Sequence, residues 1–248
     1  MTRTVAALYD IHGNLPALDA VLAELEAEPP DAVVVGGDVA AGPMPVAVLE
    51  RLRGLAWPVH FIRGNADRFV VMGYDGTIPE AELAHPLYRA DAWTATFITR
   101  ADRDWLDALP LLLRLELDGL GDVLFCHATP RSDEERVSVF ATDERLAEIL
   151  ALDPADLLVA GHTHRQFDRS VDGRRMVNAG SIGRPYEHAP GAYWLRLGPE
   201  PELRRTEYDI AAATDAFRAA GYPLAEEMLA PTDADAVARR YEEQAASA

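Results

Sequence analysis

Apolar positions in the first 65 residues occur in two patterns that follow one another along the chain. Residues 5–9, 32–35 and 59–62 form short continuous apolar runs, typical of strands that are covered on both faces. Between them, around 16–25 and 46–53, apolar residues recur every three or four positions, as on one face of a helix. This β-α-β-α-β order predicts a sheet of parallel strands joined by right-handed crossovers.

The rest of the chain predicts a second group of strands. Residues 113–117 and 123–127 read as a strand pair, and a helix over 142–150 precedes a strand at 157–160. Further short strands are expected near 166–170, 174–178, 192–197 and 203–208. We expect a single domain over residues 1–248, with no internal repeat.

Two regions lie outside this strand pattern. Residues 69–110 give only a helix start at Pro79-Glu80 and a short helix over 101–108. The last 40 residues are rich in Ala and Glu and predict a helical extension of about 209–248, interrupted at Gly221-Tyr222-Pro223.

Composition narrows the class of protein. The 49% hydrophobic and 26% charged residues are ordinary for a soluble globular protein, and no apolar run approaches the roughly 18 residues of a membrane span. The N-terminus has no signal-peptide layout, and the single cysteine, Cys126, excludes a disulfide within the chain. We therefore expect a cytoplasmic protein that neither crosses nor binds a membrane. The oligomeric state is open.

The charge of the chain excludes other functions. A net charge of −18 makes nucleic acid an unlikely partner, because such binding relies on basic surface. All 23 basic residues are Arg, so no lysine is available for a P-loop or a Schiff base. Cys126 and His127 are neighbours on a strand and point to opposite faces, which favours an inert cysteine. A small phosphorylated substrate remains open, because bound metal ions reverse the local charge.

Five short fragments, each after an apolar run, carry groups that bind divalent cations. They supply four imidazoles, two carboxylates and one amide, too many for one ion and suitable for two. The ligand candidates are Asp10, His12, Asp38, Asn65, His127, His162 and His164. Asp10 and His12 are two residues apart, as are His162 and His164, so each pair shares a face if its backbone is extended. The ends of the strands are expected to bring all five fragments to one sheet edge.

As an ordered set, these fragments resemble the motifs of the calcineurin-like metallophosphoesterases, and more narrowly those of their small bacterial phosphodiesterase branch. The resemblance covers about residues 4–185 and includes the loop Asn178-Ala179-Gly180-Ser181. It implies an α/β fold with four layers, α/β/β/α, in which helices flank two mixed β-sheets and a dinuclear metal site lies at the C-terminal edges of the strands.

The resemblance also implies a division of labour among the ligands. Asp10, His12 and His164 would hold one ion, Asn65, His127 and His162 the other, and Asp38 would bridge both. The ligand types suit Mn, Fe, Zn or Ni, and we favour Mn. Two ions roughly 3.5–4 Å apart can activate a shared water for in-line attack on phosphorus, as in other two-metal hydrolases. Asp38, Asn65 and His127 are then the candidate catalytic residues.

One position departs from the pattern of the family. Many relatives carry His after Gly-Asn as the proton donor for the leaving group, whereas this chain has Ala66. Alanine cannot transfer a proton, so no general acid is assigned. Asp67, which would orient that His, is then equally well explained as a structural cap. Candidate substrate contacts are Asn65, Arg68, Arg131, Ser181 and Arg184.

The expected activity is metal-dependent hydrolysis of phosphodiesters, and of phosphomonoesters as a variant. Two alternatives stay open at this point. One is a phosphatase of nucleotides, dinucleoside polyphosphates or phosphoproteins. The other is a metal-bound binding protein without catalysis, which the missing His suggests and the complete ligand set disfavours.

Overall fold

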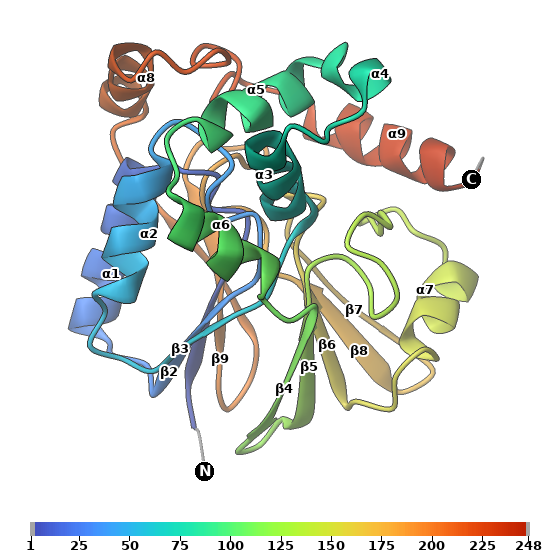
Figure 1. Cartoon of the computed structure of the whole chain (residues 1–248). Helices are drawn as coiled ribbons and strands as arrows, with labels where there is room; N and C mark the ends of the chain where they lie inside the picture. The colour runs from blue at the N-terminus through green and yellow to red at the C-terminus, as the bar shows by residue number, and fades with distance from the viewer. Residues whose placement is uncertain (1–2, 247–248) are drawn as a thin grey trace.

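Two five-stranded sheets face each other in the computed structural model, which describes residues 3–246 (Figure 1). The first sheet has the order β10-β9-β1-β2-β3 and the second the order β4-β5-β6-β8-β7. Both are mixed. In the first sheet β1, β2 and β3 are parallel and β9 and β10 pair antiparallel on one side. In the second sheet the parallel strands β5, β6 and β8 lie between the antiparallel edge strands β4 and β7. With helices on the outer faces, the four-layer α/β/β/α fold expected from the sequence is confirmed.

The first sheet contains the predicted β-α-β-α-β unit. Its strands are β1 (Val5–Leu8), β2 (Ala32–Val35), β3 (Val59–Phe61), β9 (Ala192–Leu197) and β10 (Glu202–Thr206). The crossovers are α1 (Leu15–Ala27) and α2 (Pro45–Arg53). Asn14 caps α1 through its side chain, which accepts from the backbone N–H of Ala17.

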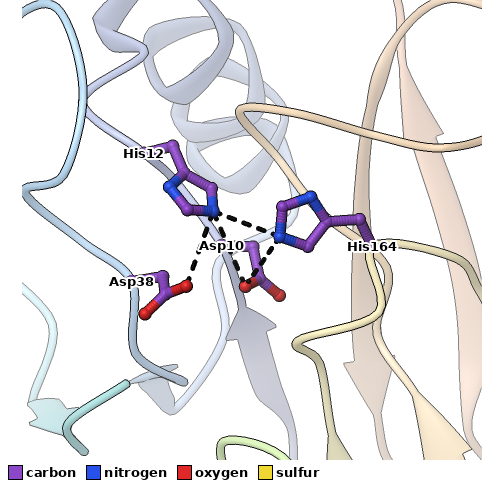
Figure 2. A group of neighbouring side chains, drawn as sticks. All are labelled: Asp10, His12, Asp38 and His164. Carbon is purple, nitrogen blue, oxygen red and sulfur yellow. Dashed lines mark hydrogen bonds and ion pairs between the residues drawn. The ribbon is translucent and has the colours of Figure 1, made fainter. Parts of the chain in front are cut away.

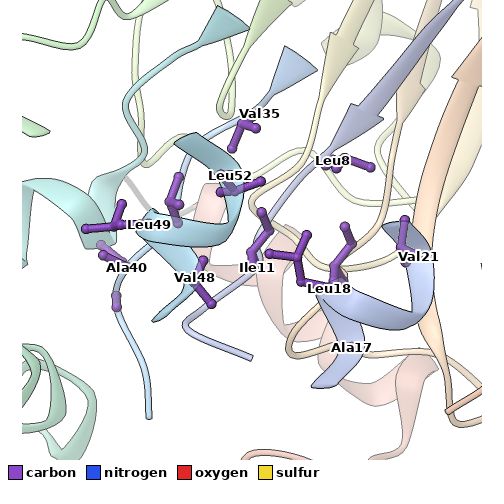
Figure 3. Close-up of a cluster of buried hydrophobic side chains, with 14 of the residues drawn as sticks. Leu8, Ile11, Ala17, Leu18, Val21, Val35, Ala40, Val48, Leu49 and Leu52 are labelled. Atoms are coloured by element: carbon purple, nitrogen blue, oxygen red, sulfur yellow. The ribbon is translucent and has the colours of Figure 1, made fainter. Parts of the chain in front are cut away.

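The two faces of this sheet bury different partners. Leu8 and Val35 pack outward against Leu18 of α1 and Leu49 of α2, as Figure 3 shows. Their neighbours Tyr9 and Val34 face the second sheet. Side chains alternate between the faces of a strand, so one apolar run supplies both layers of the core.

The second sheet carries one helix on its outer face. Its strands are β4 (Leu112–Leu117), β5 (Gly121–Cys126), β6 (Leu157–Ala160), β7 (Phe167–Val171) and β8 (Arg174–Asn178). Helix α7 (Asp143–Leu150) packs Leu146 and Ile149 against Leu158 and Met176. The hydroxyl of Thr142 caps this helix by accepting from the backbone N–H of Arg145.

Helices that the sequence did not fully predict gather at one end of the sandwich (Figure 1). They are α3 (Asn65–Asp75), α4 (Glu80–Leu83), α5 (Pro86–Ala95), α6 (Arg100–Asp107), α8 (Ile210–Ala219) and α9 (Ala234–Ala246). The sequence predicted neither α3 nor α5. Ala90 of α5 shares a buried cluster with Phe217, Tyr222 and Met228, so the C-terminal region packs on α5. None of the helices within residues 3–246 has both the length and the apolarity needed to cross a membrane.

The cysteine yields the first testable prediction. Cys126 is fully buried on β5, and burial raises the pKa of its thiol well above the ordinary value. Because the thiolate is the reactive form, native protein at pH 8 should not react with a thiol reagent such as dithionitrobenzoate. One thiol per chain should become reactive only after unfolding in guanidinium. Rapid labelling of the native protein would contradict the buried placement.

Candidate metal centre

All seven ligand candidates lie at one edge of the sandwich, each just after a strand. Asp10 and His12 follow β1, Asp38 follows β2 and Asn65 follows β3. On the second sheet, His127 follows β5, and His162 and His164 follow β6. Because β1, β2 and β3 run parallel to one another, and β5 runs parallel to β6, the carboxyl ends within each sheet meet at the same edge.

The backbone at this edge is left-handed at most of the ligand residues. Within residues 3–246, φ is positive at six non-glycine residues, and five are ligand candidates: Asp10, His12, Asp38, His162 and His164, with φ between 47° and 64°. The extended backbone expected for Asp10-x-His12 and His162-x-His164 is therefore wrong. Such conformations cost about 1–3 kcal/mol each and cluster at functional sites. They turn the chain sharply at each strand end and aim its side chain at the edge.

Glycine permits the closest approach between the two sheets. A Cβ on Gly161 would lie 2.4 Å from Oδ2 of Asp10 and 2.5 Å from the ring of Tyr9. Only glycine lets the strand end of β6 pass so near the carboxylate that follows β1. The glycine before His162 is thus required for packing.

Four ligand candidates form one compact group. Asp10, His12, Asp38 and His164 each offer an atom within 4.8 Å of the others, and all four are buried (Figure 2). Nε2 of His12 lies 3.1 Å from Nε2 of His164 and 3.6 Å from Oδ2 of Asp38. Nε2 of His164 lies 3.3 Å from Oδ1 of Asp10. This group matches the set expected for the first ion and its bridging carboxylate.

The hydrogen bonds around these rings show that a cation fits here. The Nδ1 atoms of His12 and His164 lie 3.1 and 2.7 Å from the carbonyl oxygens of Ala41 and Arg184, and must carry the hydrogen that they donate. Each Nε2 then presents a lone pair, and the two lone pairs face each other. Oδ1 of Asp10 is buried without a hydrogen-bond donor within residues 3–246. A divalent ion satisfies all three atoms at once.

A second group lies beside the first. Nε2 of His127 is 3.0 Å from Oδ1 of Asn65 and 3.5 Å from Oδ2 of Asp38, and its ring meets that of His162 edge-on at 5.2 Å. Nδ1 of His127 faces the carbonyl of Gly36 at 2.9 Å, which again leaves Nε2 for an ion. His162 differs, since its Nε2 faces the carbonyl of Glu134 at 3.0 Å and its Nδ1 is the nitrogen left over.

Burial and charge set the protonation of these rings. Burial lowers the pKa of His12 to about 4 and that of His162 to about 3, so both are neutral near pH 7 and can act as ligands. Burial also opposes charge on His127, but the carboxylate of Asp38 outweighs it and raises the pKa of His127 to about 10. The cluster therefore favours positive charge at its centre, which a divalent ion supplies.

Two residues that were not candidate ligands hold the turns in place. The carboxylate of Asp67 accepts four backbone N–H bonds, from Asp38, Val39, Ala40 and Gly64, at 2.8–3.3 Å. The structural explanation of Asp67 therefore holds in a stronger form, since it fixes the loop that carries Asp38. Its only sequence signal was its position after Gly64-Asn65.

Asn178 does the same for the other sheet. Its amide donates to the carbonyl of Gly161 at 2.6 Å and to the hydroxyl of Thr163 at 3.1 Å. Its own oxygen accepts from the N–H of Gly180 at 2.9 Å. The loop 161–164 is thus tied to the loop that follows β8.

The candidate substrate contacts fall into different surroundings. Asn65 and Arg184 line a pocket with His12 and Asp38, and the guanidinium of Arg184 makes no hydrogen bond or ion pair within residues 3–246. The hydroxyl of Ser181 is fully buried and bonds to the backbone of Asp10 and Arg184.

Arg68 and Arg131 line a separate hollow beside His127. Each is already paired there, Arg68 with Asp133 and Glu134, and Arg131 with Glu135. As substrate contacts they remain predictions, and binding an ester would require them to exchange these partners.

The pocket contains residues that sequence reasoning missed. Its wall includes the guanidinium of Arg136, which forms no ion pair or hydrogen bond in the described chain and lies over the ring of Tyr241. Three further tyrosines, Tyr88, Tyr186 and Tyr222, line the same space. They come from α5, the loop after β8 and the C-terminal region, and no local pattern marks them.

Comparisons with known proteins cover the whole site. A model of the calcineurin-like phosphoesterase superfamily domain matches residues 4–196. An uncharacterised protein of Methanocaldococcus jannaschii is 27% identical over 230 residues, 84% of this chain and 89% of that protein.

Solved structures agree. A hypothetical protein from Pyrococcus horikoshii OT3 shares the fold, with a TM-score of 0.78 and 22% identity, over 91% of this chain and 96% of its own. A metallophosphoesterase from Sphaerobacter thermophilus matches with a TM-score of 0.73 and 25% identity, over 92% of this chain and 97% of its own.

The role of Asp67 gives the second prediction. Asp67→Asn keeps the shape of the side chain but places an NH₂ group, which cannot accept a hydrogen bond, opposite backbone N–H donors. We expect manganese affinity, measured by calorimetry, to fall about 10–100-fold. The free energy of unfolding should fall by about 1–3 kcal/mol. Asp104→Asn, an exposed change on α6, is the control and should alter neither. Unchanged metal affinity in Asp67→Asn would contradict the positioning role.

Proposed function

This chain belongs to the calcineurin-like phosphoesterase superfamily, and we propose that within it the protein hydrolyses phosphodiester bonds with two divalent metal ions. The family makes it a metal-dependent hydrolase of phosphoester bonds. The observation that carries the metal assignment is the pair of Nε2 lone pairs facing each other beside the unpaired Oδ1 of Asp10.

We assign the ligands as follows. Asp10, His12 and His164 would hold one ion, Asn65, His127 and His162 would hold the other, and Asp38 would be shared. Two carboxylates and an amide oxygen among imidazoles favour manganese over softer metals. When bound, the ions polarise the phosphoryl oxygens and activate a water for in-line attack on phosphorus.

The chain's own residues act around this centre. The unpaired guanidiniums of Arg184 and Arg136 face the pocket and can neutralise phosphoryl oxygens, while the amide of Asn65 lies at its edge. The alcohol that leaves needs a proton. Because Ala66 cannot donate one, another group must supply it.

The pocket favours a diester over a monoester. Rings of Tyr88, Tyr186, Tyr222 and Tyr241 line it, and such rings stack on organic groups rather than on bare phosphate. A diester brings one negative charge and an organic group on each side. The phosphate-rich alternatives, dinucleoside polyphosphates above all, would need more cations than the two unpaired guanidiniums.

Localisation and partners follow from chemistry. A single buried thiol supports a reducing compartment such as the cytoplasm, and the ligand of the site is a small phosphoester. A net charge of −18 argues against nucleic acid as the general partner.

A comparison of two nitrophenyl esters tests the proposed function. We expect bis(4-nitrophenyl) phosphate to be hydrolysed with manganese at a kcat/KM at least about tenfold above that of 4-nitrophenyl phosphate, and chelation to abolish both activities. Asp38→Asn should lose activity on both esters by at least about 100-fold, since it removes the shared ligand. Preference for the monoester would favour the phosphatase alternative. Full activity after chelation, or in Asp38→Asn, would contradict the two-ion assignment.

A further inference from the structure

A buried carboxyl group on α5 has no partner. Asp91 is only 9% exposed, and its carboxyl forms no hydrogen bond or ion pair with any residue between 3 and 246. It lines the pocket that also contains His12, Asp38 and Ala66. Buried carboxyl groups in native proteins are nearly always paired, so one that faces a substrate pocket without a partner calls for an explanation.

A hydrogen-bonded tie fixes the position of this group. Thr94 lies one turn after Asp91, on the same face of α5. Its hydroxyl accepts from the N–H of Gly42 and donates to the carbonyl of Gly42, both at 3.1 Å. Gly42 in turn packs against the backbone of His12, where a Cβ would lie 1.8 Å from the carbonyl oxygen. The face of α5 that carries Asp91 is therefore held against the metal-binding loops.

The groups around Asp91 favour its protonated form. Burial raises the pKa of Asp91 well above the ordinary value, and the negative charges of Asp38 and Asp67 raise it further. Arg184, across the pocket, acts in the opposite direction. The other titratable groups of the pocket wall near it are Tyr88 on the same helix, Tyr222 from the C-terminal region and the neutral ring of His12.

We propose that Asp91 is the general acid of this site and donates the leaving-group proton that Ala66 cannot supply. This role rests on the proposed function, since it requires that a phosphoester be cleaved in this pocket. Asp91 on α5 and Ala66 on α3 line the same pocket, the one in which a substrate would bind.

The proton balance is simple. Water adds its oxygen to phosphorus and releases one proton to solvent, and the bond between phosphorus and the leaving oxygen breaks with its electron pair on that oxygen. The carboxyl O–H of Asp91 transfers its proton to this oxygen, so the product leaves as a neutral alcohol. The carboxylate that remains takes a proton from solvent before the next turnover, and the net reaction consumes one water.

A role in stability does not account for Asp91. The carboxyl group forms no hydrogen bond or ion pair within residues 3–246 that would offset the cost of burying it. A group kept unpaired and buried lowers stability, as is common for residues retained for activity.

Leaving-group dependence tests the proposal. Asp91→Asn keeps the size of the side chain but cannot transfer a proton. We expect it to slow hydrolysis of diphenyl phosphate, a poor leaving group, by about 10²–10⁴-fold, and that of bis(4-nitrophenyl) phosphate by less than about tenfold. The wild-type kcat/KM for diphenyl phosphate should fall at high pH as the acid ionises, and this fall should be absent in Asp91→Asn. An equal loss on both esters, or no loss on diphenyl phosphate, would overturn the role.

Two further variants sharpen the test. Ala66→His restores a donor at the position used by relatives, so it should speed diphenyl phosphate hydrolysis more in the Asp91→Asn background than in wild type. Equal gains in both backgrounds count against the proposal. Asp104→Asn on α6 is the matched carboxyl-to-amide control and should leave both rates unchanged.

A readout without metal or substrate separates this role from the proposed function. The pKa of Asp91 is raised in the folded state above the unfolded value of about 3.9, so wild type loses stability as pH rises through the folded pKa. Asp91→Asn lacks this loss, so its advantage in free energy of unfolding over wild type should be small near pH 4 and grow with pH. An advantage that does not change with pH contradicts the protonated carboxyl.

The outcomes remain distinguishable. Wild-type protein that cleaves neither ester would overturn the proposed function and this role together. Active wild type with a uniform response of Asp91→Asn overturns only the role of Asp91.

Discussion

The centre depends on backbone strain that hydrogen bonds hold in place. Five ligand residues adopt left-handed backbone at strand ends, a conformation that costs about 1–3 kcal/mol each. The carboxylate of Asp67 binds four N–H groups around the Asp38 loop, and Asn178 ties loop 161–164 to the turn after β8. Each anchor is buried, so its bonds are not replaced by water. The ligand geometry is therefore fixed by the protein's own hydrogen bonds.

Carboxylates and imidazole lone pairs that repel one another are held close together at this centre. Asp10 and Asp38 are buried close together. Burial opposes a positive charge on His127, but the neighbouring Asp38 raises the pKa of this ring to about 10. Lone pairs of His12 and His164 face each other at 3.1 Å. A divalent cation relieves these contacts together, since it attracts carboxylates and imidazole lone pairs alike. A buried cluster of this kind therefore suits a divalent cation.

The pocket is completed by segments outside the ligand-bearing strands. The family match ends at residue 196, yet Tyr222 and Tyr241 line the pocket from beyond it. They reach it because Tyr222 belongs to the cluster that packs the C-terminal region on α5, and because the ring of Tyr241 lies near that of Tyr186. The candidate metal ligands thus lie within the part that matches the family model, while part of the pocket wall comes from α5 and the C-terminal region.

The sequence by itself determined the β-α-β-α-β unit of the first sheet, the strand pair 113–117 and 123–127 of the second, and the ligand candidates at the strand ends, because strand runs and the residues that follow them are local patterns. It also marked Ala66 as the missing donor. Only the tertiary structure decided the rest. The backbone at the ligand pairs is left-handed rather than extended, and Asp67 anchors the loop that carries Asp38. Helices α3 and α5, which the sequence did not predict, carry residues that line the pocket. Arg136, Asp91 and the tyrosines come together in the pocket through packing between segments far apart in the chain. No local pattern of the sequence encodes such contacts.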